Sequence, residues 1–446
     1  MDMRKKKKKK IIILGLCIGF AALLAVCLGL FAHLKTPPFE ISKVYSLSLG
    51  ESEKAGVRYV AAVDLFGDGR KEVLMSYDVY SVEEQMVEGG LSITNHYEET
   101  KVVVFSSNTT GDSQKLWEYD SGLTRQTVAT GDFDGDGKLD LVVGGYKIEN
   151  EEEFPTSAIS GVEVLLQEDG SFDKVFSSNI PKFLPGSIVT ADFDGDGRTD
   201  FVVSGLAMEN ESPYHAYLFH NEGEGDFTMS PIALMEGIVV EDMWQADINS
   251  DGSSDLIIHT FDFDDDTYSI ILLLNDGRGE FEFRELDVPV VSMVIGDFTG
   301  DGYPDIMYTN TIQSVDKVYF LRNEQGEFAE PSPIDIQGGG GWLDTMIAGD
   351  FNNAGALDVV LLERNAGFIG DSGEVETSLI GHLFLIEQTT EGELSFTSEW
   401  SQKLLEEKDL SPKYDAVAAD INDDGWIDLI IVSGEGGLYL ALNQHA

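Results

Sequence analysis

Cysteine is almost absent from this 446-residue chain, and basic residues are scarce. The two cysteines, Cys17 and Cys27, lie in an N-terminal apolar run, so the rest of the chain can form no disulfide framework. Residues 1–35 hold eight of the 29 basic residues and one of the 80 acidic ones, which leaves 21 basic against 79 acidic residues. A net charge of −58 in this remainder repels nucleic acid, so we exclude DNA and RNA as partners, and it attracts multivalent cations.

The sequence also has few signals of helices or of catalysis. After residue 34 no stretch has a sustained helical period, which favours an all-β fold. The seven histidines are scattered and include no His-Glu-x-x-His pair. Residues 370–373 (Gly-Asp-Ser-Gly) resemble the nucleophile segment of trypsin-like proteases, but they lie in an acidic insertion of a cysteine-free region. We interpret this match as chance and predict that the protein is not an enzyme.

The N-terminus is where the basic and apolar residues gather. Residues 1–10 are predicted to be a basic cytoplasmic tail, and residues 11–34 form an uncharged run that is long enough to span a bilayer. We expect a single-pass signal anchor in the cell membrane, a linker over residues 35–38, and all later residues outside the cytoplasm. A cleaved signal peptide is one alternative. A lipoprotein signal, with Leu-Ala-Val before Cys27, is the other.

A nine-residue acidic pattern occurs seven times in the remainder. Its second copy reads Asp132-Phe-Asp134-Gly-Asp136-Gly-Lys138-Leu-Asp140 and is followed by Leu-Val-Val. The copies start at Asp64, Asp132, Asp192, Asp247, Asp297, Asp350 and Asp420. A period of about 50–70 residues is typical of solenoids, propellers and arrays.

The spacing of these residues suits calcium, which binds six to eight oxygen ligands. Side-chain oxygens at positions 1, 3, 5 and 9 and the backbone carbonyl at position 7 can converge on one ion, and glycine at position 6 permits the sharp turn. Position 12 is apolar, which excludes an EF-hand. The expected ligands are Asp132, Asp134, Asp136, Lys138 and Asp140; Asp192, Asp194, Asp196, Arg198 and Asp200; Asp247, Asn249, Asp251, Ser253 and Asp255; Asp297, Thr299, Asp301, Tyr303 and Asp305; and Asp420, Asn422, Asp424, Trp426 and Asp428.

Two copies are incomplete, so we predict about five calcium ions. The first has Phe66 at position 3 and Glu72 at position 9, and the sixth has Ala354 at position 5. The alternative for every copy is a simple acidic turn that binds no ion.

The segments around each copy predict the fold. A short β-type run precedes each acidic turn, a second follows it, and a third and often a fourth come later, separated by glycine and asparagine turns. Four strands in each of seven units describe a seven-bladed β-propeller over residues 39–446. Only two strands follow the last acidic turn, so we expect residues 39–49 to supply the outer strand of the seventh blade and close the ring.

This pattern resembles the FG-GAP and VCBS repeat families, which include the propeller of integrin alpha chains, and the resemblance covers about residues 39–446. The calcium loops match well and the Phe-Gly half is weak, so VCBS-type is the closer label. The resemblance implies that each loop joins the first and second strands of a blade and binds calcium on one face. It also implies a role in adhesion, ligand binding or scaffolding.

Long insertions favour the opposite face as the functional one. They run over about residues 77–100, 146–160 and 364–380, between the second and third strands of their blades. We predict a surface adhesion or ligand-binding module whose protein or glycan ligand docks there. A carbohydrate-active protein, either a lectin or a lyase-like enzyme, is the alternative, although no aromatic position recurs from blade to blade. Asp262, Asp264, Asp265 and Asp266 are an additional candidate cation site, and glycines 338–341 are a segment where a ligand could approach the backbone.

Overall fold

The computed structural model describes most of the region after the N-terminal run. The described residues are 39–46, 53–87, 90–106, 113–148, 158–208, 214–234, 238–262, 267–311, 317–335, 342–369, 375–388, 394–407, 414–433 and 437–444. The predicted tail, anchor and linker at residues 1–38 lie outside them. Within the described ranges, no helix is long and apolar enough to cross a membrane.

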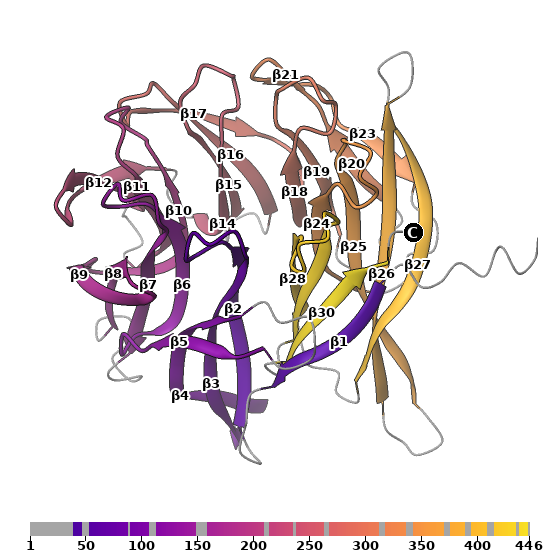
Figure 1. Ribbon diagram of the computed structural model, residues 1–446, viewed down its shortest axis with the longest axis horizontal. Coiled ribbons are helices and arrows are strands. Elements are labelled where there is room, and N and C mark those ends of the chain that lie inside the picture. Colours follow the sequence, from indigo (N-terminus) through magenta and orange to yellow (C-terminus); the bar gives the residue numbers. More distant parts are fainter. Residues whose placement is uncertain are drawn as a thin grey trace, which may run out of the picture.

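Seven four-stranded antiparallel sheets stand around a central axis (Figure 1). From the inner to the outer strand, the first six blades are β2 (Glu53–Val63), β3 (Glu72–Val87), β4 (Gly90–Phe105) and β5 (Lys115–Tyr119); β6 (Thr124–Gly131), β7 (Asp140–Ile148), β8 (Ala158–Glu168) and β9 (Ser171–Asn179); β10 (Phe183–Ala191), β11 (Asp200–Ala207), β12 (Tyr214–Gly223) and β13 (Asp226–Ala233); β14 (Ile238–Ala246), β15 (Asp255–Asp262), β16 (Thr267–Asn275) and β17 (Phe281–Leu286); β18 (Ser292–Gly296), β19 (Asp305–Thr309), β20 (Lys317–Leu321) and β23 (Ser332–Asp335); and β24 (Trp342–Gly349), β25 (Asp358–Ile369), β26 (Val375–Gln388) and β27 (Leu394–Glu407). The predicted all-β, seven-bladed propeller is confirmed.

The seventh blade closes the ring with a strand from the start of the propeller. Its order is β28 (Tyr414–Ala419), β29 (Asp428–Ser433), β30 (Gly437–Asn443) and β1 (Phe39–Ser46), with Phe39 opposite Asn443. The predicted closure is therefore confirmed. The seventh blade therefore has four strands, like the other blades, and the outer edge of β30 is paired.

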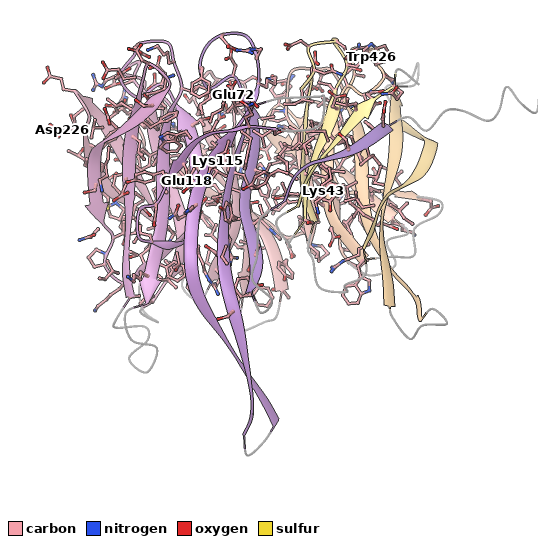
Figure 2. The ribbon with its side chains drawn as sticks, turned by 60° about the horizontal axis from the view of Figure 1, so that its bottom comes forward. Lys43, Glu72, Lys115, Glu118, Asp226 and Trp426 are labelled. Carbon is pink, nitrogen blue, oxygen red and sulfur yellow. The ribbon has the colours of Figure 1, made fainter. Side chains whose placement is uncertain are left out.

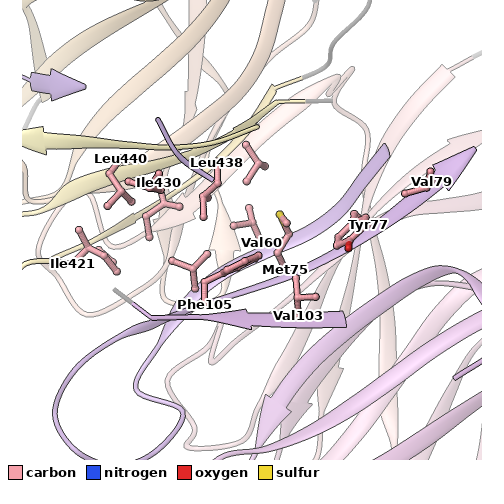
Figure 3. Packing of buried hydrophobic residues seen from close by; sticks show 14 residues of the cluster. Val60, Met75, Tyr77, Val79, Val103, Phe105, Ile421, Ile430, Leu438 and Leu440 are labelled. Atoms are coloured by element: carbon pink, nitrogen blue, oxygen red, sulfur yellow. The ribbon is translucent and has the colours of Figure 1, made fainter. Parts of the chain in front are cut away.

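The core lies between the blades rather than inside any one of them. Seven buried clusters fill the seven junctions, and each contains the position-2 side chain of one acidic turn. In β7, Val142 faces the third blade, whereas Leu141 and Val143 face the first. A second strand that is buried on both faces explains the unbroken apolar run after each acidic turn. Figure 3 shows the junction of the seventh and first blades, where Ile430 and Leu440 pack near Val60 and Phe105.

The insertions of the first and sixth blades are largely strands rather than the loops that the sequence suggested. In the first blade β3 and β4 stay paired out to Val87 and Gly90, and in the sixth β25 and β26 pair out to Ile369 and Val375. Figure 2 shows the β3–β4 hairpin extending far beyond one side of the ring, while Glu72 and Trp426, from the acidic turns, lie toward the other side. The insertions thus project opposite the acidic turns, as predicted.

Closure by β1 makes a specific mutational prediction. Phe39 is 3% exposed and packs edge-on against Phe351 of the sixth blade, with ring centroids 6.4 Å apart. We expect Phe39→Ala to lower the free energy of unfolding by about 3–5 kcal/mol, the usual cost of removing a buried phenylalanine side chain. Denaturant unfolding measures this, with Glu40→Ala on the exposed face of the same strand as the control. Equal stability of the two variants would contradict the closure.

Candidate metal-binding loops

The seven acidic turns share one backbone scaffold, which the acidic residues at positions 1 and 9 hold. In every turn the position-1 carboxylate accepts a hydrogen bond from the N–H at position 6, at 2.8–3.0 Å. The position-9 carboxylate accepts one from the N–H at position 2, at 2.8–3.2 Å. The position-6 glycines have φ between 85° and 90°, which confirms why glycine is required there.

The scaffold forms even where metal ligands are missing. The first turn has Phe66 at position 3 and the sixth has Ala354 at position 5, yet Asp64 and Asp350 keep their bonds to the backbone. The N–H of Ala354 also donates to Asp350 Oδ1 at 2.9 Å. The shape of a turn is therefore not evidence for an ion, and the residues at positions 3 and 5 decide whether it can bind one.

In five turns the position-9 aspartate also bonds to the backbone at or just after the end of the third strand. In the third blade, Asp200 is fully buried, and its Oδ1 accepts a hydrogen bond from Asn221 N at 2.8 Å. The same contact occurs at Asp140, Asp255, Asp305 and Asp428. The pKa of all five aspartates is raised to about 6, chiefly by burial and also by nearby carboxylates, which together outweigh the lowering effect of the backbone hydrogen bonds.

The second and third turns bring three carboxylates together at positions 1, 3 and 5. In each, one oxygen from every carboxylate lies within 4.8 Å of the others. In the second turn, Lys138 Nζ lies 2.9 Å from Asp136 Oδ2, and this hydrogen bond lowers the pKa of Asp136. Arg198 pairs with Asp196 in the same way. A basic side chain at position 7 thus partly neutralises each cluster.

The other three complete turns carry fewer charges. The fourth and seventh have asparagine at position 3, and its amide donates to the position-5 aspartate at 2.9 Å. The fifth has the buried Thr299 at position 3, and Arg322 Nη2 lies 3.3 Å from Asp301 Oδ2. We therefore expect the fifth turn to bind calcium more weakly than the second and third.

The donor sets of these five turns fit calcium. They offer carboxylate, amide or hydroxyl oxygens at positions 1, 3 and 5, and a carboxylate keeps lone pairs after accepting one backbone hydrogen bond per oxygen. The position-7 residues Lys138, Arg198, Ser253, Tyr303 and Trp426 each donate their backbone N–H to the position-5 aspartate. Calcium binding through all these residues remains a prediction.

Sequence reasoning missed an asparagine that joins neighbouring blades. Asn275 Nδ2 donates to Phe193 O in the preceding blade at 2.8 Å and to Ser254 O in its own at 3.1 Å. Asn221, Asn323 and Asn443 make the same pair of contacts. The available signal was an asparagine 15–21 residues after the position-9 aspartate in these four blades, and we interpreted it only as a turn residue.

Some earlier predictions lie outside the described residues. These are Asp264, Asp265 and Asp266 of the additional cation site, glycines 338–341 and the Gly-Asp-Ser-Gly segment at 370–373.

Comparisons with known proteins agree with this architecture. An FG-GAP-like repeat model matches residues 192–258 and 297–361, and an FG-GAP repeat model matches residues 125–146. Cartilage acidic protein 1 from Xenopus tropicalis is 24% identical over 345 residues, which cover 69% of this chain and 48% of that protein. The chain thus spans about half the length of this curated relative.

Solved structures of two rhamnogalacturonan lyases share the fold. YesX matches with a TM-score of 0.51 and 14% identity, and YesW with 0.50 and 12%; each match covers 91% of this chain and 76% of the lyase. At these identities the likeness concerns the fold alone.

The sheet order and the turns define a seven-bladed β-propeller with an acidic turn between the first and second strands of each blade. The chain contains FG-GAP-type repeats, which the matching models place at residues 125–146, 192–258 and 297–361. The matching models are FG-GAP models, whereas our sequence interpretation preferred the VCBS label.

Two substitutions in the second turn separate its scaffold from its ligands. Asp140 accepts hydrogen bonds from two backbone N–H groups, and Asp140→Asn turns an NH₂ group toward one of them, so we expect a loss of about 1–3 kcal/mol in chelator. The loss should be larger with calcium, because Asp140 is also an expected ligand. Asp136→Ala copies Ala354 of the sixth turn, so the fold should keep its stability in chelator and lose only the stabilisation by calcium at this turn. Denaturant unfolding of both variants in both conditions measures this. Equal stability of Asp140→Asn and Asp136→Ala in chelator would contradict the separation between scaffold and ligand residues.

The raised pKa values predict an unusual pH dependence in chelator. A carboxyl group whose pKa is higher in the folded protein stabilises the fold below its unfolded pKa, near 4, and this contribution disappears as pH rises through about 6. Metal-free protein should therefore melt at a higher temperature at pH 5 than at pH 7. Calcium should raise Tm more at pH 7 than at pH 5, because it binds the ionised form. A Tm in chelator that rises from pH 5 to pH 7 would count against these shifts.

Proposed function

We propose that this protein is a calcium-stabilised, ligand-binding or adhesion propeller held at the outer surface of the cell membrane by residues 11–34. The observation that supports it best is the division of the ring into two faces. One carries the acidic turns, five of them with oxygen-rich ligand sets, and the other carries the long hairpins β3–β4 and β25–β26. A face held rigid by ions leaves the opposite face available for a partner.

Electrostatics supports the calcium part of the proposal. The propeller carries far more acidic than basic residues, and in the second and third turns three carboxylates lie within a few ångströms of one another. Bound calcium reduces this repulsion, and because it binds the folded turn in preference to the unfolded chain, it stabilises the fold by mass action. Millimolar calcium outside the cell would fill sites of modest affinity.

A glycan ligand is a second candidate because of one exposed aromatic side chain. Trp342 begins β24 at the end of an inner strand opposite the acidic turns, and it is 43% exposed. A sugar ring can stack on such a surface. The fold shared with rhamnogalacturonan lyases agrees with this option without favouring catalysis.

Thermal melting tests the calcium dependence directly. At a hundredfold excess over its dissociation constant, one calcium ion adds about 2.7 kcal/mol of stability. We expect a much higher Tm in calcium than in chelator, and little stabilisation by magnesium, which prefers a smaller and stricter octahedron. The same Tm in all three conditions would mean that the turns bind no calcium.

A hairpin deletion tests the ligand face. Val82 pairs with Asn95, so residues 82–95 can be replaced by an Asn-Gly turn while the remaining β3–β4 pairing is kept. Glycan-array binding and capture of cell-surface proteins, with and without calcium, compare the shortened chain with the full one. Loss of a calcium-dependent ligand with unchanged Tm supports the proposal. Loss of glycan-array binding in Trp342→Ala supports the glycan candidate. Unchanged binding would exclude the β3–β4 hairpin as the docking site.

A further inference from the structure

In five blades, one residue at the end of the third strand lies next to the acidic turn, and its identity differs from blade to blade. It is the residue directly before the asparagine or glutamine whose N–H bonds to the position-9 aspartate. Leucine occupies it in the second, fourth and seventh blades, as Leu166, Leu274 and Leu442. Arg322 occupies it in the fifth blade, and His220 in the third. Only the third blade thus presents an imidazole to its turn, among the five blades with this contact.

A ring nitrogen of His220 lies close enough to two carboxylates of that turn for all three side chains to bind one ion. Its Nδ1 is 3.3 Å from Asp194 Oδ2, and ligand atoms of Asp194, Asp200 and His220 lie within 4.8 Å of one another. Two ligands at about 2.0–2.1 Å from a tetrahedral zinc ion are separated by about 3.3 Å, so the observed distance fits a shared ion. Among the side chains that the structure describes, this is the one group of this kind that contains a nitrogen donor.

The surroundings hold the imidazole in this orientation. His220 Nε2 lies 3.1 Å from Ser230 Oγ on the outer strand β13, and a proton on Nε2 leaves the Nδ1 lone pair facing Asp194. A metal-binding histidine is usually fixed by such a bond on its other nitrogen. From the next blade, the β16–β17 turn covers the ring closely, because a Cβ added to Gly279 would lie 3.1 Å from His220 Cε1.

We propose that the third turn is a mixed nitrogen–oxygen site that binds a transition-metal dication such as Zn²⁺, with His220, Asp194 and Asp200 as its protein ligands. Imidazole favours zinc and related ions, whereas an all-oxygen turn favours calcium. The inference rests on the proposed cation-binding role of this turn and specifies its ion. The five complete turns would then differ in kind, with one responding to a different metal from the rest.

Zinc titration of the full-length chain tests the assignment. We expect wild type, with its other turns filled by calcium, to bind one zinc ion more tightly than any further zinc. His220→Leu, which installs the residue of the second, fourth and seventh blades, should weaken this binding about tenfold or more. Arg322→Leu, the same replacement in the fifth blade, should leave it unchanged. Cobalt provides a second readout, because its visible absorption depends on its ligands and their geometry, and His220→Leu should change that spectrum.

The outcomes separate this inference from the proposed function. Equal zinc affinity and equal cobalt spectra for wild type and His220→Leu would overturn the mixed site, even if calcium still binds to the other turns and raises Tm. If zinc binding depends on His220 but calcium does not change the Tm, the mixed site is supported and the proposed function is overturned. A calcium-dependent Tm like that of wild type would show that His220→Leu folds normally.

Discussion

Every blade of this protein depends on a buried carboxylate that accepts hydrogen bonds from backbone amides. The acidic residue at position 9 begins the second strand and binds the N–H at position 2 of its turn, and in five blades it also binds an amide of the third strand. It therefore joins the turn and two strands at one end of the sheet. The position-2 side chain that it fixes enters the core of a blade junction, as Phe193 does between the third and fourth blades. The hydrogen bonds of one turn thus position the packing between two blades.

This arrangement explains why binding ions and forming the turn are separate properties of one motif. Positions 1 and 9 serve the backbone and remain acidic in all seven turns, including those with Phe66 and Ala354. Positions 3 and 5 can vary because the turn does not need them to hold its shape. The cost of burying position 9 next to other carboxylates falls when a cation is present. Calcium would therefore act on a turn that is already formed and would stabilise the junction behind it.

The sequence predicted the architecture well and its side-chain roles only in part. Seven acidic turns, four strands per unit and closure by Phe39–Ser46 could all be derived, because repeats expose the same local signals many times. The hairpin β3–β4 was mistaken for a loop, because its pairing depends on two strands whose sequences show no clear alternation. The inter-blade contacts of Asn275 and the position of His220 beside Asp194 could not be derived, because both depend on which strands and blades become neighbours.

Anomalous diffraction from crystals grown in calcium tests the central claim most directly, since it locates each ion and its ligands. The account predicts ions in the turns that start at Asp132, Asp247, Asp297 and Asp420, an ion in the turn that starts at Asp192, and none in the turn with Ala354. Oxygen ligands should lie at about 2.3–2.6 Å from each calcium ion. Empty turns in a folded ring, or an ion in the sixth turn equal to the others, would contradict it.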